Sequence, residues 1–281
     1  MFADIDKIAI VAGEGPLPIR LAESLVSRGK EVAALCIDGY SNPTDFTDIC
    51  PAEAFRLGNA KHAIGILKER DISNLVLVGR INRPTWRDLR PDSLAIRILG
   101  SAALSGGDDA LLRRVIKYLE QKEGLTVWPI TDILEELVVG PGLLGGVSVP
   151  DGAQEDIARG VTVLREMGPL DIGQAVVCQH GLVLGVEAAE GTDRLIRRCA
   201  DYRRPGRGPV LVKLSKPGQI DKADLPTIGP NTILGAAESK FSGIVVEAER
   251  TLVVSHEETI READSRGLFI LAIDSAGDGR Q

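Results

Sequence analysis

The chain has 281 residues, of which 44% are apolar and 26% charged, a composition typical of one large globular domain or two ordinary ones. The net charge of −7 argues against general nucleic-acid binding, and three histidines leave little basis for a zinc site or a His-based triad. The four cysteines show no CxxC or Cys/His pairing, which indicates reduced thiols. No apolar run approaches a membrane span and no signal-peptide pattern opens the chain, so we expect a cytoplasmic protein.

The first part of the chain alternates between apolar runs and segments of helical spacing. Strands are predicted over 7–12, 31–37, 75–79 and 125–128, and helices over 19–28, 59–70, 94–100 and 110–121. A strand, a Gly-rich turn, a helix and a second strand require a parallel sheet with a right-handed crossover. We therefore predict an α/β fold whose N-terminal domain, residues 1–133, is a Rossmann-like parallel sheet.

Three features of this domain are candidate contacts for an anionic ligand. The turn GEGPLP contains Gly13, Gly15, Pro16 and Leu17, and its backbone N–H groups either point at a phosphate or form a plain tight turn. Arg80 follows a predicted strand, so it either binds an anion at the sheet edge or lies in a solvated loop. Asp108 precedes a predicted helix, which makes it an N-cap or a site residue.

The segment 134–150 is rich in glycine and proline and is interpreted as a linker. A second α/β domain with a mixed sheet is predicted over 151–281. Its helices are expected over 154–167, 193–202, 232–240 and 257–266, and its strands over 175–178, 182–186, 209–212, 243–246, 252–254 and 268–273. The first three of these strands are expected to be buried and to bring their polar flanks to one sheet edge.

Those polar flanks contain oxygen ligands of the kind that Mg²⁺ or Mn²⁺ prefers: Glu187, Glu190, Asp193, Asp221 and Asp224. Nearby lysines could neutralise the charge on phosphate oxygens; they are Lys213, Lys216 and Lys222. The side chains of Gln174 and Gln219 could position a water or a sugar hydroxyl. The set fits metal-assisted phosphoryl hydrolysis. An ordinary loop ion pair with an Asx turn also explains the segment around Asp221.

An island of positive charge lies between Arg194 and Lys216, with eight basic residues against one acid, Asp201. In an acidic chain it indicates an anionic ligand or a membrane surface, or else a solvated basic face.

Several segments, taken in order, resemble the LpxI family over nearly the whole chain. They are IAIVAGEGPLP, GGDDALLRRV, DIGQAVVC, VEAAEGTDRLIRR, VLVKLSKPGQ and DLPTIGPNTI, of which EGTD, KPGQ and DLPTIG are the most specific. The resemblance implies a UDP-2,3-diacylglucosamine pyrophosphatase of lipid A biosynthesis. It also implies two domains joined by a linker, a divalent metal, usually Mg²⁺, a homodimer, and action in the cytoplasm against the inner membrane.

The resemblance gives Asp224 a catalytic, metal-linked role. The family loop reads Gln-Asp-x-Arg-x-Asp-Leu-Pro, whereas here Ile220 replaces the first acid and Lys222 the arginine. With the residue chemistry above, the predicted catalytic residues are Asp224, Asp221, Lys216 and Gln174, and the predicted metal ligands are Asp224, Glu187 and Asp193. The predicted substrate-binding residues are Gly13, Gly15, Pro16, Leu17, Arg80, Asp108, Gln174, Glu190, Gly191, Thr192, Asp193, Lys213, Gln219 and Thr227.

Two other functions are alternatives to this hydrolase. A non-catalytic module that binds a nucleotide sugar or lipid would use the Gly-rich turn and the basic island for recognition alone. A nicotinamide-dependent oxidoreductase is less favoured, because no acid lies about twenty residues past a proper GxGxxG. Asp38, after the second strand, is the only residue that points toward one.

Overall fold

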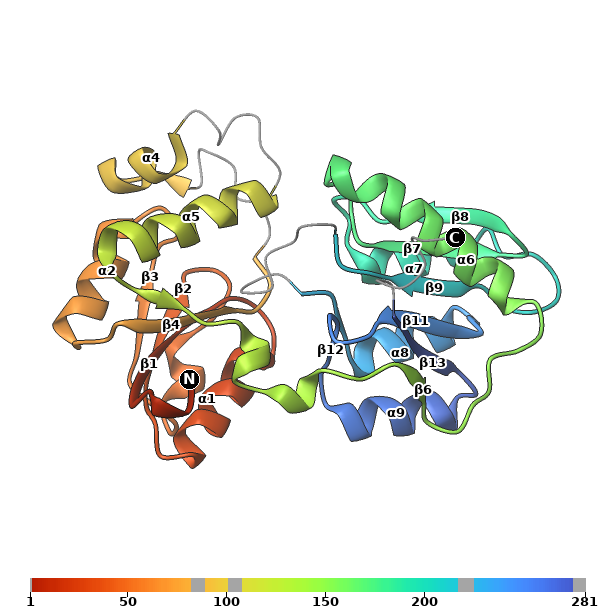
Figure 1. Cartoon of the computed structure of the whole chain (residues 1–281), viewed down its shortest axis with the longest axis horizontal. Coiled ribbons are helices and arrows are strands. Elements are labelled where there is room, and N and C mark those ends of the chain that lie inside the picture. The colour runs from red at the N-terminus through yellow and green to blue at the C-terminus, as the bar shows by residue number, and fades with distance from the viewer. Residues whose placement is uncertain (1, 82–88, 101–107, 217–224, 275–281) are drawn as a thin grey trace. The chain divides into compact units, whose positions relative to one another are not determined.

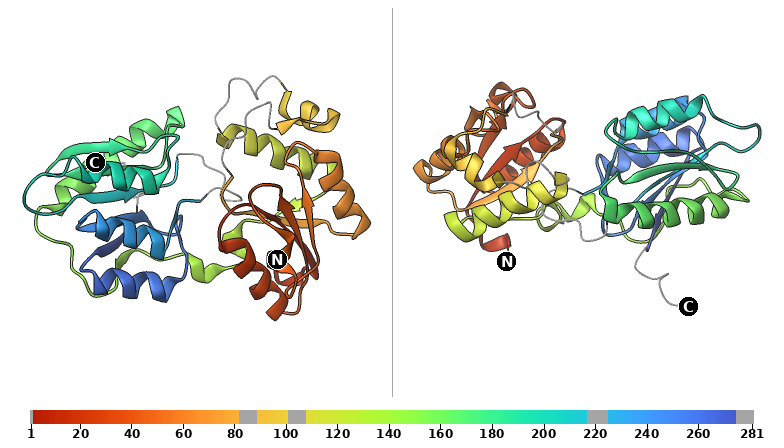
Figure 2. Two further views of the ribbon diagram at one scale, coloured as in Figure 1. Left: turned by 180° about the vertical axis from the view of Figure 1, so that it is seen from behind. Right: turned by 90° about the horizontal axis from the view of Figure 1, so that it is seen from above.

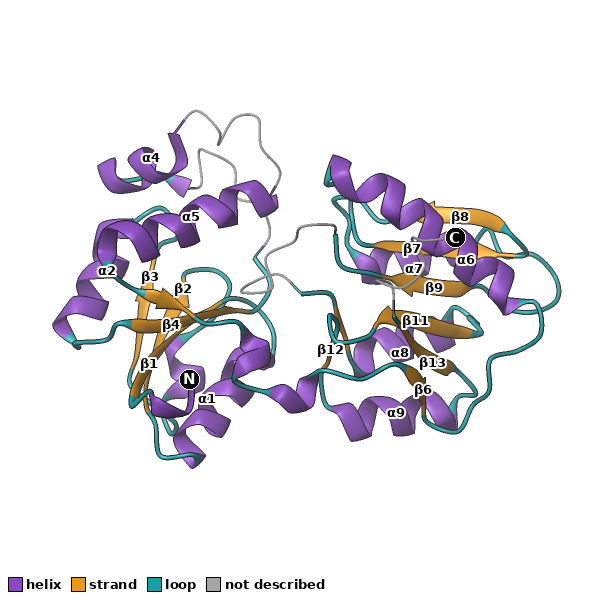
Figure 3. Ribbon diagram, viewed as in Figure 1, coloured by secondary structure: helices purple, strands orange, loops and turns teal. Residues whose placement is uncertain are grey.

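The computed structural model describes residues 2–81, 89–100, 108–216 and 225–274 (Figure 1). Its described residues form two compact units, 2–135 and 136–274. Each unit has its own sheet with helices packed against it, which confirms the predicted α/β class. Figure 3 distinguishes the helices from the strands of each unit.

The first unit contains a five-stranded sheet in the order β3-β2-β1-β4-β5. The strands are β1 (Lys7–Ala12), β2 (Glu31–Ile37), β3 (Ala52–Phe55), β4 (Asn74–Val78) and β5 (Thr126–Val127). Every neighbouring pair is parallel, so all five carboxyl ends meet at one edge. This arrangement confirms the predicted Rossmann-like layer. The sequence reasoning missed β3, whose four residues, AEAF, contain neither a β-branched residue nor a continuous apolar run.

Four helices pack around this sheet: α1 (Leu17–Ser27), α2 (Ala60–Glu69), α4 (Ser93–Leu99) and α5 (Asp108–Glu123). The core on one face joins Ile64, Leu94 and Ile116 of the helices to strand residues such as Ala9 and Leu35. In Figure 1, α1 lies on the side of the sheet opposite α5. Short 3₁₀ helices cover Phe2–Asp4, Pro43–Phe46 and Ile130–Asp132 in this unit, Glu135–Leu137 across the boundary, and Gly168–Leu170 in the second unit.

The segment 134–150, expected to be a linker, contributes a strand to the second sheet. β6 (Gly142–Leu144) pairs antiparallel with β13 (Phe269–Ile273), with Leu143 opposite Leu271. The glycine-rich composition concealed this strand, because glycine and proline are depleted in strands and mark turns. Most of the segment therefore belongs to the second unit.

The second unit contains a six-stranded sheet in the order β6-β13-β11-β9-β7-β8. Its other strands are β7 (Ala175–Gln179), β8 (Leu182–Val186), β9 (Val210–Lys213) and β11 (Gly243–Glu247). β9, β11 and β13 are parallel, whereas β6, β7 and β8 are antiparallel to their neighbours, so the sheet is mixed as predicted. The expectation that β8 is buried was wrong. Because β8 is an edge strand, Leu182 and Val183 remain 43% and 36% exposed.

Helices cover both faces of this sheet (Figure 2). α6 (Ala153–Met167) packs on one face, where Ala153 and Leu164 join a core with Val176 and Val212. The other face is covered by α7 (Thr192–Ala200), α8 (Pro230–Glu238) and α9 (His256–Ser265). A separate two-stranded parallel ladder joins β10 (Thr227–Ile228) to β12 (Leu252–Val253).

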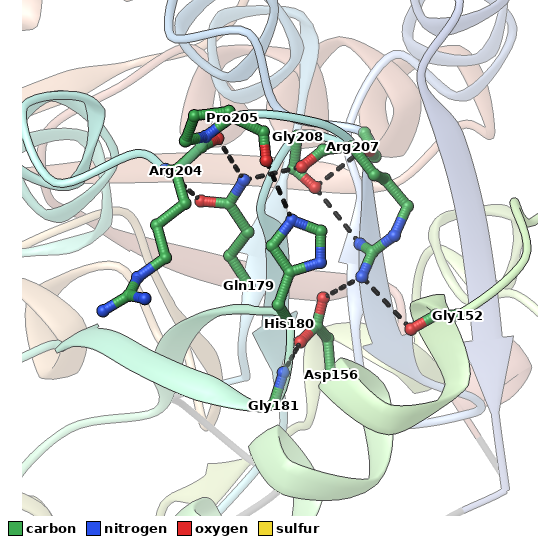
Figure 4. Close-up of polar contacts among 10 residues, drawn as sticks. Gly152, Asp156, Gln179, His180, Gly181, Arg204, Pro205, Arg207 and Gly208 are labelled. Atoms are coloured by element: carbon green, nitrogen blue, oxygen red, sulfur yellow. Dashed lines mark hydrogen bonds and ion pairs between the residues drawn. The ribbon is translucent and has the colours of Figure 1, made fainter.

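A polar network fastens the loop before β9 to the rest of the second unit (Figure 4). The buried side chain of Gln179 donates to the carbonyls of Arg204 and Arg207 and accepts from the Arg204 N–H. Arg207 also forms an ion pair with the buried Asp156 of α6. The loop is thereby held against both α6 and β7.

Among the described residues, none of the helices combines the length and the apolar character needed to cross a bilayer.

Candidate functional site

One edge of the second sheet gathers the polar groups that the sequence placed beside its strands. β7 is antiparallel to both β8 and β9, and β9 is parallel to β11. The carboxyl ends of β8, β9 and β11 therefore lie at the same edge as the amino end of β7. Gln174, Glu187, Lys213 and Glu247 flank or end these strands. The structure thus brings to one edge those residues of the predicted polar flanks, Gln174, Glu187 and Lys213, together with Glu247.

Glu187 is the centre of this edge. Its side chain is buried, and Oε2 accepts a hydrogen bond from the Gln174 N–H at 3.0 Å. Oε1 accepts from the Thr192 hydroxyl at 2.6 Å, and that hydroxyl in turn accepts from Lys213 Nζ at 2.7 Å. Lys213 is only 5% exposed. The hydroxyl therefore links a buried carboxylate to a buried ammonium group, which satisfies the requirement that buried charges be hydrogen-bonded.

Gly173 allows the close approach that positions Gln174. Its φ is +152°, and a Cβ at this position would lie 2.2 Å from the Glu187 carbonyl oxygen. Only glycine fits there. The Gln174 side-chain oxygen Oε1 is buried and has no hydrogen-bond partner among the described residues. An acceptor of this kind can receive a donor hydrogen from a water or a hydroxyl.

Two further pairs lie at the same edge, where β9 continues into 214–216. The Ser215 N–H donates to Glu247 Oε2 at 2.8 Å, and its hydroxyl donates to the same oxygen. Lys216 forms an ion pair with Asp171. Glu247 is buried and was missed by the sequence reasoning, although its position as the last residue of an apolar strand was a usable signal.

At the N-terminus of α7, neither Thr192 nor Asp193 is the N-cap residue. Gly191, at φ +78°, is the N-cap residue, and there is no side-chain cap hydrogen bond. The Thr192 hydroxyl is instead directed to Glu187, while Asp193 lies exposed in the first turn. Glu190 forms an ion pair with Arg198 at 2.6 Å. The backbone N–H of Glu190 itself and this Arg198 partner hold the pKa of Glu190 below its ordinary value.

In the first unit, backbone hydrogen bonds join the Gly-rich turn to the end of β4 and the residues after it. The Gly13 N–H donates to the Val78 carbonyl at 2.8 Å, and Glu14 and Arg80 exchange two backbone hydrogen bonds. A Cβ on Gly13 would lie 2.8 Å from the Gly79 carbonyl carbon and the Arg80 oxygen. Gly15 is in the left-handed region at φ +110°. Proline is the N-cap residue of α1 and also occupies position 18, so the first turn keeps few N–H groups for an anion.

The side chains of the remaining predicted residues make none of the contacts above or fall outside the described part of the chain. The Arg80 side chain is exposed, and the Thr227 hydroxyl donates to the Leu225 carbonyl at 3.1 Å. Asp108 is the first residue of α5, and its side chain is not described. Gln219, Asp221, Lys222 and Asp224 all fall within 217–224, outside the described residues.

The described residues by themselves contain no cluster of metal ligands. Among them, no three acids, histidines or cysteines gather as a metal-binding group. Both oxygens of Glu187 are already hydrogen-bonded within the protein. The third predicted ligand, Asp224, lies outside the residues the structure describes.

Comparison with known proteins identifies the family. Sequence models of the LpxI N-terminal domain and the LpxI C-terminal domain match residues 7–137 and 140–271. A curated relative, the UDP-2,3-diacylglucosamine pyrophosphatase LpxI of Caulobacter vibrioides, is 38% identical over 276 residues, which cover 95% of this chain and 98% of the relative.

Among solved structures, CobK precorrin-6A reductase aligns over 96% of this chain and 88% of its own with a TM-score of 0.34 and 13% identity. Glycinamide-RNase-transformylase T from Mycobacterium tuberculosis aligns over 65% of this chain and 44% of its own with a TM-score of 0.24 and 16% identity. Neither structural likeness is strong enough to argue from. With both domain models matched in order and a curated relative aligned along almost its whole length, the chain belongs to the LpxI family.

Proposed function

We propose that this protein hydrolyses the pyrophosphate of UDP-2,3-diacylglucosamine in lipid A biosynthesis. Water adds its oxygen to one phosphorus, the bridging P–O bond breaks, and the products are UMP and 2,3-diacylglucosamine 1-phosphate, known as lipid X. The single observation that carries the proposal is the 38% identity with a curated pyrophosphatase of this name over 95% of the chain.

The sheet edge around Glu187 supplies chemistry that suits this reaction. The Lys213 and Lys216 ammonium groups carry positive charge toward which a pyrophosphate oxygen is attracted. Glu187, through Thr192, holds the Lys213 ammonium in one orientation. Such preorganised charge favours the charge that develops on the phosphoryl oxygens. The buried Gln174 oxygen can accept a hydrogen bond from a water or a sugar hydroxyl.

We also propose that the reaction depends on Mg²⁺, with Mn²⁺ as a substitute. Asp224 would hold such an ion, and the chemistry that the ion would supply is polarisation of phosphoryl oxygens and a lower pKa of bound water. The support is the oxygen-rich residue set of the C-terminal half, together with the assignment of Asp224 by family resemblance. The test is to strip the purified protein with a chelator and then titrate in Mg²⁺, Mn²⁺ or Ca²⁺ while following UMP release.

The assignment of Asp224 is tested by Asp224→Ala beside a matched control, Asp201→Ala, which removes an exposed acid after α7. We expect Asp224→Ala to abolish UMP release while the unfolding midpoint stays near that of the wild type, and the control to turn over normally. A fully active Asp224→Ala variant would overturn this role. If the wild type bound the glycolipid without releasing UMP, the protein would be a binding module instead.

We further propose that the protein acts in the cytoplasm, peripheral to the inner membrane, and as a homodimer. The support for membrane contact is a basic surface on α7 and the loop after it, comprising Arg194, Arg197, Arg198, Arg203 and Arg204. Tyr202, 60% exposed, lies within this stretch. A basic surface on an acidic chain is attracted to anionic lipid. Sedimentation with anionic and with neutral vesicles tests the contact, and light scattering of the purified protein tests the dimer.

A further inference from the structure

Glu247 is a buried acid of the second sheet to which the proposed reaction assigns no part. It is the last residue of β11, which lies between β9 and β13 (Figure 1), and it is only 7% exposed. An ionised carboxylate is costly to bury unless hydrogen bonds replace the water that it loses. The donors that it binds therefore indicate why an acid occupies this position.

Both hydrogen-bond donors of Ser215 bind one oxygen of this carboxylate. The Ser215 N–H donates to Glu247 Oε2 at 2.8 Å, and the Ser215 hydroxyl donates to the same oxygen. The ladder between β9 and β11 ends where Lys213 pairs with Val246. Two residues beyond Lys213, the Glu247 side chain accepts the N–H that a ladder carbonyl would otherwise bind. It therefore extends the attachment of the chain to β11 past the end of β9.

The segment 214–216 is also held from the side of β7. The Leu214 N–H donates to the Gln174 carbonyl at 3.0 Å, and Lys216 forms an ion pair with Asp171. Because β9 lies between β7 and β11, Glu247 holds this segment from the opposite side. The Lys216 side chain is 16% exposed. The backbone from which this lysine extends is thus fixed before any ligand binds.

We propose that Glu247 is a positioning residue, which acts through Ser215 to fix the Lys216 ammonium group where it meets the pyrophosphate. A lysine side chain has many rotamers, and it loses conformational entropy when its ammonium group contacts an anion. A backbone held in advance removes part of that cost and keeps the positive charge in place as charge develops on the phosphoryl oxygens. The inference rests on the proposed function, in which Lys216 attracts a pyrophosphate oxygen.

The experiment is a double-mutant cycle on the full-length protein. Glu247→Met, which keeps the length of the side chain but removes the acceptor, is combined with Lys216→Met. The readouts are kcat and KM for UMP release, and the Kd of UDP by calorimetry with Mg²⁺ present. We expect Glu247→Met alone to lower kcat/KM about tenfold or more and to weaken UDP binding. In the Lys216→Met background it should have little further effect, because the group that it positions is absent.

Two further variants control for the loss of charge. Glu247→Gln keeps a carbonyl oxygen that can accept from both Ser215 donors, so it should retain most of the wild-type turnover. Glu166→Met removes an exposed acid of α6 and should match the wild type in both readouts. If the unfolding midpoint shows that Glu247→Met does not fold, Ser215→Ala takes its place in the cycle, because it removes one donor and leaves the carboxylate intact.

The outcomes separate this inference from the proposed function. If the loss caused by Glu247→Met is the same with and without Lys216, or if folded Glu247→Met matches the wild type, the positioning role is overturned and the hydrolase stands. If the wild type releases no UMP while UDP binding shows the coupling between the two residues, the positioning role stands and the hydrolase is rejected. A wild type that neither releases UMP nor binds UDP rejects both.

Discussion

Arg207 and Asp156 form an ion pair in the interior of the second unit. Arg207 Nη2 lies 2.6 Å from Asp156 Oδ2, and the two side chains are 13% and 0% exposed. The same guanidinium nitrogen donates to the Gly152 carbonyl, and the other carboxylate oxygen accepts from the Gly181 N–H at 2.7 Å. One carboxylate thus joins α6, the turn between β7 and β8, and the loop before β9 (Figure 4).

Removing this carboxylate should destabilise the protein strongly. Asp156→Ala leaves the buried Arg207 charge and the Gly181 N–H without their partner, a change that costs about 3–5 kcal/mol. Urea unfolding of the purified protein measures the loss. The control is Glu262→Gln, which breaks an exposed pair with Arg266 and should cost less than about 1 kcal/mol. If the two variants lost similar amounts of unfolding free energy, burial would not be the reason that the Asp156–Arg207 pair stabilises the protein.

The Thr192 hydroxyl should matter for turnover as well as for stability. Thr192→Val keeps the shape of the side chain but removes the group that joins Lys213 to Glu187. We expect kcat/KM for UMP release to fall at least about tenfold, the rate equivalent of roughly 1.4 kcal/mol. Thr162→Val is the control, because Thr162 is exposed on α6 and its hydroxyl bonds only within that helix. If Thr192→Val left kcat/KM unchanged, the contacts around Glu187 and Lys213 would play no part in the reaction.

Two glycine-to-alanine substitutions in the first unit should have opposite effects. At Gly13 a Cβ would lie 2.8 Å from backbone atoms of Gly79 and Arg80, so Gly13→Ala must push the turn away from β4 and destabilise the protein. At Gly65, inside α2, a Cβ meets no atom within 4 Å, and Gly65→Ala should stabilise by about 0.5–1 kcal/mol. Thermal unfolding of both variants checks the signs. A tolerated Gly13→Ala would mean that the turn has room to move.

Local patterns predicted much of this fold. Apolar runs marked β1, β2 and β4, and helical spacing marked α1, α2 and α6 to within a few residues. The β3 and β6 strands were missed because their residues, AEAF and GLL, acquire a strand conformation from the neighbouring strands rather than from their own propensity.

Predictions for the site were limited by sheet order. The proximity of Glu187 and Lys213 was predictable, because both were expected at strand ends that share one edge of the sheet. The partnership of Ser215 with Glu247, which are 32 residues apart, depends on β9 lying next to β11, and no spacing in the sequence states that. The link between Asp156 and Arg207, 51 residues apart, likewise requires the packing of α6 on the sheet.

Acid should selectively weaken the pair between Glu123 and Lys68. The hydrogen bond from Lys68, at 2.7 Å, holds the pKa of Glu123 below its ordinary value of 4.5. A carboxyl whose pKa is lower in the folded state stabilises that state above its unfolded pKa, and the contribution disappears as the pH falls through the folded value. Lys68 is 63% exposed, so the contribution at neutral pH is at most about 1 kcal/mol.

The test of this pair compares Glu123→Gln with the wild type by urea unfolding across the acid range. We expect the variant to be less stable at neutral pH, with the difference shrinking once the pH falls below about 4.5. Glu69→Gln, on the exposed end of α2, serves as a control for the loss of one negative charge. A difference that grew in acid would reverse the sign assigned to this carboxyl.

The four thiols should be unreactive in the folded protein. Cys36, Cys50, Cys178 and Cys199 are all buried and free. Burial raises the pKa of Cys178 to about 12 and that of Cys50 to about 11, and it raises the pKa of the other two thiols as well. Only the thiolate attacks, and each pKa unit above the ambient pH lowers its fraction tenfold.

Titration with Ellman's reagent at mildly alkaline pH checks this expectation. Folded protein should react at least about a hundredfold more slowly than protein unfolded in guanidinium, because both the raised pKa values and the burial oppose attack. The unfolded chain should give four equivalents, which serves as the internal control. Rapid reaction of one thiol in the folded state would identify a local opening of the core around it, and serine substitution at each of the four positions would show which thiol reacts.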